Sequence, residues 1–243
     1  MGTWTVGEYP ESYRHGQEAE YTFGLVGESG CGKTSLSRAL LGLLESESGH
    51  IWWKGKDILQ FSNNEWRKFR QKMQIIFQDP YGSLNPSISI GQAVMEPMMV
   101  HLKLSKLKAR KEALKLLEKT GIAEESFDKL PADFSGGQRQ RISIARALAM
   151  KPEIIICDES VSALDVSVQA QNLNLLNDLK DEFQLSYLFI SHDLSVVKYM
   201  SDRIMVMQEG EFVEIEEADE LYKNPKNEYT KMLISSIPGT PNK

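Results

Sequence analysis

Residues 27–35 limit the possible fold of this chain more than any other part of its sequence does. They read Gly-Glu-Ser-Gly-Cys-Gly-Lys-Thr-Ser and fit the pattern G-x-x-x-x-G-K-[ST]. The residues before them, 23–26, are apolar and typical of a strand, and residues 33–44 place leucines at helical spacing. A glycine-rich turn between a strand and a helix presents backbone N–H groups and a helix N-terminus to an anion. The segment therefore predicts a phosphate-binding loop in an α/β fold.

Each residue type in this phosphate loop suits a bound nucleoside triphosphate. Glycines keep side chains away from the path where backbone N–H groups approach phosphate oxygens. Lys33 is predicted to reach the β- and γ-phosphates, and the Thr34 hydroxyl is predicted to be a ligand of Mg²⁺. The other residues predicted to bind the nucleotide are Gly27, Ser29, Gly30, Cys31, Gly32 and Ser35.

Two acidic residues follow a second apolar strand. Residues 154–157 are Ile-Ile-Ile-Cys, and Asp158 and Glu159 come directly after them. In open α/β sheets, ligands bind at the carboxyl ends of the strands, so this strand end is expected beside the phosphate loop. Asp158 is predicted to hold Mg²⁺, and Glu159 is predicted to polarise a water that attacks the γ-phosphate. Two solvated acids after a core strand are the alternative.

The pattern of strands and helices divides the chain into a core and an insert. Strands alternate with helices over residues 1–80 and 151–243, which predicts a mostly parallel sheet covered on both faces. Residues 81–150 carry helical patterns without strand signals, so they are predicted to form an all-helical insert.

The segment Phe134-Ser135-Gly136-Gly137-Gln138 resembles the signature motif of ABC transporter ATPases, with Phe134 in place of the usual leucine. Ser135 suits a helix N-cap, and the glycines leave N–H groups open to an anion. A capped helix with an exposed loop is the alternative. The resemblance implies a RecA-like P-loop NTPase core with an inserted helical signature subdomain. It further implies that these residues act in trans on ATP held by a second cassette in a head-to-tail dimer.

Three further elements match the same family in order and spacing. Gln78 resembles the glutamine that touches Mg²⁺ and water, and His192 resembles the histidine that contacts the γ-phosphate. The resemblance covers residues 21–240 and makes Glu159, His192 and Gln78 the catalytic residues. It implies ATP and Mg²⁺ as ligands, with the ion held by Thr34, Gln78 and Asp158. The dimer-interface D-loop then consists of Ser162, Ala163, Leu164 and Asp165.

Residues 77–86 indicate a branch of this family. They read Phe-Gln-Asp-Pro-Tyr-Gly-Ser-Leu-Asn-Pro and resemble a stretch of the oligopeptide and dipeptide importers. Residues 158–167 and the tail 227–238 fit the same branch. The resemblance implies an ATPase that drives peptide import through separate permease subunits, with a solute-binding protein as an indirect partner. Nickel and glycoside importers share the branch, so the solute stays open.

Composition narrows the possible partners and location. The 243 residues include 28 Lys and Arg against 34 Asp and Glu, a net charge of −6, which argues against nucleic acid as a partner and against an ABC protein of DNA repair. The sequence has no apolar run near the length of a membrane span and no secretory leader pattern. A peripheral place on the cytoplasmic face of the membrane is therefore expected. The two cysteines, Cys31 and Cys157, lie inside motifs, which fits a reducing compartment.

Two parts of the sequence leave their interpretation open. Residues 1–20 do not have strand patterns, so the antiparallel N-terminal strands usual in the family are expected to be reduced. Trp4 and Tyr9 are the candidates for stacking on adenine. A catalytically weak or truncated partner of a sister cassette is accordingly the alternative function. The methionine-rich residues 95–100 fit either core packing of the insert or a soft groove for a permease helix.

Overall fold

The computed structural model describes residues 21–46, 48–162 and 164–237 of the chain. Its residues divide into two compact units, the first formed by Met1–Arg70 with Phe189–Lys243 and the second by Gln71–Leu188. Trp4, Tyr9, Ala163 and Pro238 lie outside the described residues.

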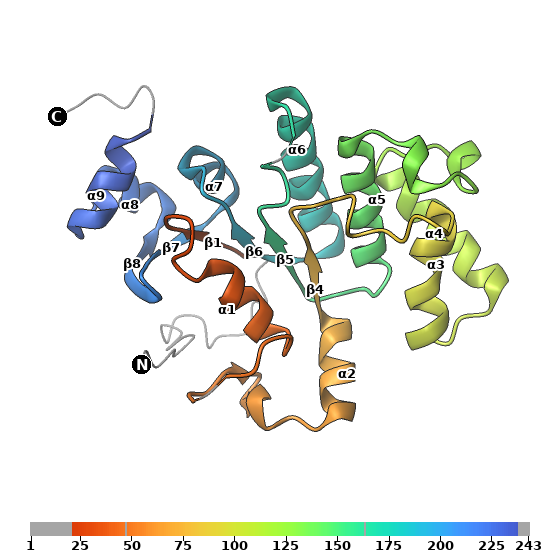
Figure 1. Cartoon of the computed structure of the whole chain (residues 1–243), viewed down its shortest axis with the longest axis horizontal. Coiled ribbons are helices and arrows are strands. Elements are labelled where there is room, and N and C mark those ends of the chain that lie inside the picture. The colour runs from red at the N-terminus through yellow and green to blue at the C-terminus, as the bar shows by residue number, and fades with distance from the viewer. Residues whose placement is uncertain (1–20, 47, 163, 238–243) are drawn as a thin grey trace. The chain divides into compact units, whose positions relative to one another are not determined.

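The first unit is built on parallel strands that lead to the phosphate loop. Its strands follow the order β6-β1-β7-β8, in which β1 and β7 are parallel and β7 and β8 form an antiparallel pair. Gln208, Glu209 and Gly210 have the residue types of a turn between two strands, and Glu209 and Gly210 adopt positive φ between β7 and β8. The elements are β1 Thr22–Val26, α1 Lys33–Leu40, β2 Trp52–Trp53, β3 Lys56–Asp57, a 3₁₀ turn Ile58–Gln60, α2 Asn63–Lys72, α7 Leu194–Met200, β7 Arg203–Gln208, β8 Glu211–Glu217, α8 Ala218–Lys223 and α9 Glu228–Ser235 (Figure 1).

The helix after the phosphate loop is shorter than its sequence pattern predicts. The leucine spacing predicts a helix to residue 44, whereas α1 ends at Leu40. Gly42 adopts a φ of 62° and lies so close to the Trp66 ring that an added Cβ would stand 2.8 Å from it. Trp66 also packs edge-on against Phe61 and Phe69. This aromatic cluster therefore turns the chain away from the helix axis.

The second unit combines parallel strands with the three longest helices and α3. β4 and β5 are parallel and in register from Met73 opposite Ile154 to Ile76 opposite Cys157, and β6 is the next strand. β6 runs across the division between the two units. The elements are β4 Met73–Ile76, α3 Ile90–His101, α4 Lys106–Lys119, 3₁₀ turns Glu124–Ser126 and Pro131–Asp133, α5 Gly136–Leu148, β5 Ile154–Asp158, α6 Val166–Phe183 and β6 Ser186–Ile190.

Helices α3 and α5 of the second unit begin at residues with capping side chains. Ser89 and Ser135 each accept a bond from the N–H three residues on, and Gln92 and Gln138 return the capping contact. Between β4 and β5 the described residues form helices and turns without a strand. The mostly parallel α/β fold is thus confirmed, whereas the boundaries of a separate subdomain at residues 81 and 150 stay a prediction.

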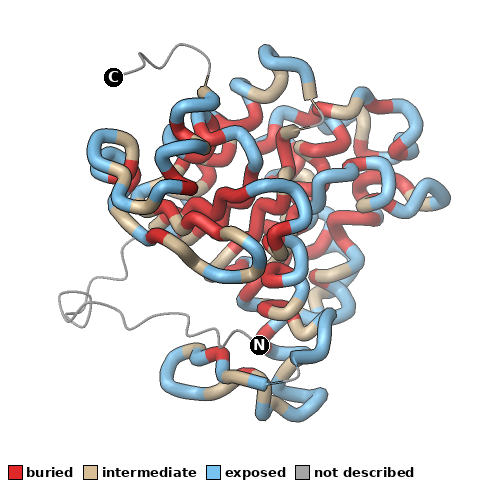
Figure 2. Tube along the Cα trace, turned by 60° about the vertical axis from the view of Figure 1, so that its left-hand side comes forward, coloured by how far each residue is buried: buried red, intermediate tan, exposed pale blue. Residues whose placement is uncertain are grey.

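The methionine-rich run is buried in part. Met95 and Met98 are buried, while Met99 and Val100 are exposed. Core packing therefore accounts for the buried pair. Figure 2 shows buried and exposed stretches alternating along the trace, and β1, β5 and β6 are each buried at four of five positions. No helix among the described residues has both the length and the apolar character needed to cross a bilayer.

Candidate active site: the phosphate loop and the acidic strand end

The phosphate loop has the backbone geometry that its glycines predict. Gly27, Gly30 and Gly32 adopt φ values of 156°, 84° and 108°. Nothing lies within 4 Å of a Cβ built on Gly30, so this side of the loop is open. Gly32 begins α1 without a side-chain cap, which leaves the first N–H groups of the helix available to an anion.

The side chain of Lys33 turns back into the loop. Its Nζ donates to the carbonyl oxygens of Gly27 at 2.7 Å and Glu28 at 2.8 Å, and it lies 3.6 Å from Cys31 Sγ. The side chain is only 6% exposed, whereas Thr34 and Ser35 are exposed. The predicted phosphate-binding loop therefore encloses the ammonium group of Lys33.

Two contacts from the C-terminal part of the chain hold the loop from outside. The Glu28 N–H donates to Tyr229 Oη at 3.0 Å, and the Gly210 N–H donates to Cys31 O at 2.9 Å. The phosphate-loop motif does not predict that Tyr229 or Gly210 contacts the loop. The single related signal is that the tail around Tyr229 matches the importer branch.

His192 lies near the end of the strand that enters the phosphate loop. It follows β6, and the N–H of the preceding Ser191 donates to Leu25 O of β1 at 3.3 Å. β1 ends at Val26, one residue before the loop. Asp193 then caps α7 by accepting from Ser195 N and Val196 N. Within the first unit, the fold therefore places the histidine and the loop at the same edge of the sheet.

In the second unit, the acidic strand end lies beside Gln78. Asp158 ends β5 with 6% exposure, and Glu159 follows in a left-handed conformation with a φ of 48°. Ser162 Oγ donates to Glu159 O at 2.9 Å and accepts from Gln78 Nε2 at 3.4 Å. Burial raises the pKa of the neighbouring Cys157 to about 12, so this thiol stays protonated and unreactive.

The signature segment and the D-loop meet within the second unit. A Cβ built on Gly137 would stand 2.4 Å from Val168 Cγ1, so close packing against α6 requires glycine there. A Cβ on Gly136 would lie 3.7 Å from Leu164. Asp165 accepts from Val168 N at 3.0 Å and caps α6. The signature segment and the D-loop are separate motifs in the sequence, and the fold brings them together.

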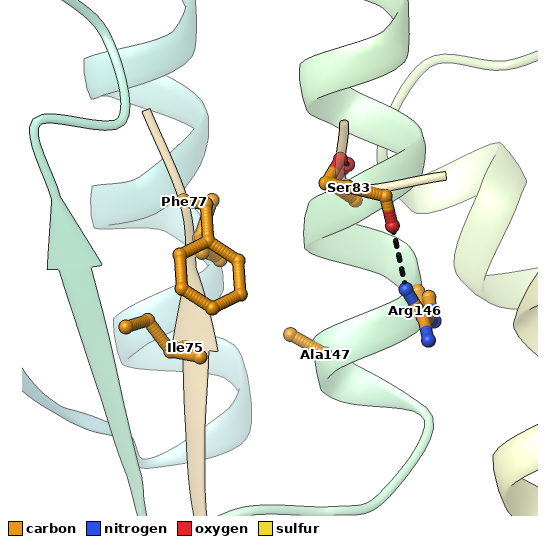
Figure 3. A pocket seen from close by; sticks show the side chains of 7 residues that line it. Ile75, Phe77, Ser83, Arg146 and Ala147 are labelled. Atoms are coloured by element: carbon orange, nitrogen blue, oxygen red, sulfur yellow. Dashed lines mark hydrogen bonds between the residues drawn. The ribbon is translucent and has the colours of Figure 1, made fainter. Parts of the chain in front are cut away.

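The segment after Gln78 is tied to the signature helix α5. Ser83 Oγ and Ser143 Oγ lie 2.8 Å apart, and Arg146 Nη1 donates to Ser83 O at 2.7 Å (Figure 3). The Arg139 guanidinium stacks 3.9 Å from the centre of the Tyr81 ring. A cavity of about 170 Å³ lies between β4 and α5, lined by Ile75, Ile76, Phe77, Ser83, Ser143, Arg146 and Ala147.

A match to a protein-family model shows the family of this chain. The model of the ABC transporter family matches residues 16–162, more than half of the chain. The chain belongs to the ABC transporter family. The oligopeptide transport ATP-binding protein OppF of Escherichia coli is 49% identical over 218 residues, and DppF, the dipeptide transport ATP-binding protein of the same organism, is 48% identical over 217. Each alignment covers 89% of this chain and 65% of the relative, so the chain spans just under two thirds of their length.

Solved structures of ABC proteins have the same fold. One is cbiO1 of Clostridium perfringens, a part of the transporter complex cbiONQ, with a TM-score of 0.76 and 31% identity over 84% of this chain and 80% of that one. Another is the ATP-binding cassette MJ0796, a dimer in a post-hydrolysis state bound to ADP and Pi. Its TM-score is 0.73 and its identity 28% over 83% of this chain and 87% of that one. The predicted P-loop NTPase fold is thereby confirmed.

Proposed function

We propose that this ABC family chain hydrolyses ATP and energises the import of oligopeptides or dipeptides through separate membrane permease subunits. The observation that carries the ATPase part is the phosphate loop, where the uncapped start of α1 lies next to the buried ammonium of Lys33, which the loop carbonyls hold. Identity near 50% to proteins named for oligopeptide and dipeptide transport supports the solute class. A catalytically weak partner of a sister cassette is not favoured, since Glu159 and His192 are present.

ATP binding would begin with an exchange of partners at Lys33. Its Nζ now donates to two backbone carbonyls, Gly27 O and Glu28 O. A β- or γ-phosphate oxygen carries negative charge and forms a stronger bond with an ammonium than a neutral carbonyl does. Backbone N–H groups of Ser29, Gly30, Cys31 and Gly32 and the exposed Ser35 would surround the remaining phosphate oxygens.

Hydrolysis requires a water molecule placed in line with the γ-phosphate. Glu159 is the assigned base, because its carboxylate follows the buried strand β5 directly. Gln78 is assigned to orient that water, and its contact with Ser162, which bonds to Glu159 O, keeps these groups together. His192 is assigned to the γ-phosphate, since its segment bonds to the strand that enters the loop.

The assigned residues also fit a magnesium ion. The Thr34 hydroxyl, the Gln78 amide and the Asp158 carboxylate offer the oxygen donors that Mg²⁺ prefers. Asp158 is a nearly buried carboxylate, a group whose charge a bound cation compensates. When bound, Mg²⁺ neutralises charge on the β- and γ-phosphates.

The proposed assembly pairs this chain with a second cassette. Ser135, Gly136, Gly137 and Gln138 would contact ATP held by the partner, and the D-loop would line the shared interface. The helix N-terminus at Gly136 supports the first assignment, because it directs N–H groups toward an anion. The complex would lie on the cytoplasmic face of the membrane, with a solute-binding protein as an indirect partner and no nucleic acid.

Growth on peptides tests the import function. The chain would be expressed in an Escherichia coli strain that lacks OppF and needs a tripeptide to supply an essential amino acid. We expect growth with the wild-type chain and none with Glu159→Gln at equal protein level. A chain that hydrolyses ATP in vitro but never restores peptide uptake would contradict the peptide-import assignment.

A further inference from the structure

We infer that Tyr229 is a positioning residue for the phosphate loop, so that the C-terminal helix α9 sets the affinity of the loop for ATP. This inference goes beyond the proposed function and rests on it only where ATP is the readout. Tyr229 and the loop are 201 residues apart in the sequence, and the motif has no place for a tyrosine.

The contact fixes one peptide group of the loop from its outer side. The Glu28 N–H donates to Tyr229 Oη at 3.0 Å. The carbonyl of the same peptide group, Gly27 O, accepts from Lys33 Nζ at 2.7 Å. One peptide plane is therefore held at both of its polar atoms. It lies next to Gly27, which adopts a φ of 156° and, without a Cβ, has an unusually free backbone.

Tyr229 is itself held firmly on the sheet. Asn227 caps α9 by accepting from Tyr229 N at 2.8 Å. The Glu214 carboxylate of β8 accepts from Lys226 N at 2.8 Å and from Asn227 N at 3.0 Å. Burial raises the pKa of Glu214, but hydrogen bonds such as these outweigh it and leave that pKa below its usual value. The carboxylate is thus ionised at neutral pH, and charge-assisted bonds join the start of α9 to β8, beside which it lies (Figure 1).

The tyrosine is neutral and buried where it meets the loop. It is 8% exposed, and burial raises the pKa of its hydroxyl. A neutral hydroxyl accepts the Glu28 N–H without placing an anion near the phosphate site. This matters for a loop that must bind a polyanion, because a negative charge there would repel the substrate.

The importance of the contact grows when ATP binds. Once Lys33 turns to the phosphates, Gly27 O and Glu28 O lose the ammonium as a donor. The bond to Tyr229 is then the contact in the described structure that still fixes the orientation of this peptide group. Removing the hydroxyl therefore weakens the bound state more than the free state, and it raises the Kd for ATP.

The substitution Tyr229→Phe separates positioning from packing, because it keeps the ring and removes only the hydroxyl. Tyr187→Phe is the matched control. Tyr187 is also buried, and its hydroxyl donates to Leu176 O of α6 at 2.8 Å and not to the phosphate loop. Both variants lose one buried hydroxyl bond, so both are expected to lower the melting temperature by a similar amount.

The test measures amide hydrogen exchange without nucleotide and then ATP binding by calorimetry. In Tyr229→Phe we expect exchange in the peptide spanning residues 24–32 to rise about threefold to tenfold, and the Kd for ATP to rise about fivefold to tenfold. Tyr187→Phe should change neither. Unchanged loop exchange in Tyr229→Phe, or an equal rise in both variants, would overturn the inference. A wild-type chain that binds no ATP would instead refute the proposed function, while the exchange arm would still decide the role of Tyr229.

Discussion

Glu159→Gln should lower ATP turnover by about 10²- to 10⁴-fold while changing the Kd for ATP less than about twofold. The amide has nearly the shape of the carboxylate, but it accepts no proton and polarises water weakly. Glu159 follows β5 in a left-handed conformation and is half-buried, and its carbonyl accepts from both Ser162 N and Ser162 Oγ. Because glutamine has nearly the same shape and keeps these backbone bonds, the substitution should leave the local fold intact.

Phosphate release and ATP binding, measured on the same preparation, check this prediction. Glu153→Gln is the matched control, since Glu153 directly precedes the same strand and its carboxylate pairs with Lys72 at 2.9 Å. The control should keep near-normal turnover. If Glu159→Gln retained more than about a tenth of wild-type turnover, another group would have to be the base.

Gly27→Ala should weaken ATP binding by more than about tenfold and lower the free energy of unfolding by about 1–3 kcal/mol. A Cβ at this position would stand 2.1 Å from Met207 O and 2.8 Å from Cys31 Sγ. The first of these atoms belongs to the backbone of β7, so it moves only with the strand. The first residue of the phosphate loop must therefore shift, and the N–H groups behind it shift too.

Gly210→Ala provides the comparison for Gly27→Ala. Gly210 has a φ of 86°, and nothing lies within 4 Å of a Cβ built on it. This variant carries the backbone cost of a left-handed alanine, about 1–2 kcal/mol, without a clash, and it keeps the N–H that donates to Cys31 O. Chemical denaturation and ATP titration distinguish the two variants. Equal effects on ATP affinity would contradict the steric account of Gly27.

Local signals in the sequence predicted many elements closely. The sequence pattern predicts a helix over residues 90–101, and α3 spans Ile90–His101, where Ser89 and Gln92 provide a complete capping box at its start. The sequence also predicts a hairpin around Lys54 and Gly55, and both residues adopt the positive φ that the turn between β2 and β3 requires. Such features depend on residues within one turn of each other.

Features that depend on distant contacts escaped prediction. α1 ends at Leu40 because Gly42 packs against Trp66, 24 positions along the chain, and the helical leucine pattern does not contain that information. The short helix α7, Leu194–Met200, was not predicted from the sequence, although Asp193 caps it. At the site, motif spacing identified the phosphate loop, but it gave no sign that Tyr229 and Gly210 hold the loop from outside.

The proposal is that a second cassette, either an identical chain or a sister cassette, completes each ATP site. Its form with two identical chains is tested most directly by turnover per chain as a function of chain concentration. The signature segment would act on ATP held by the partner, so an isolated chain would lack part of its site. We predict that phosphate release per chain rises with concentration and then reaches a plateau, as the dimer forms. No phosphate release at any concentration, or a rate per chain that does not depend on concentration, would contradict this account.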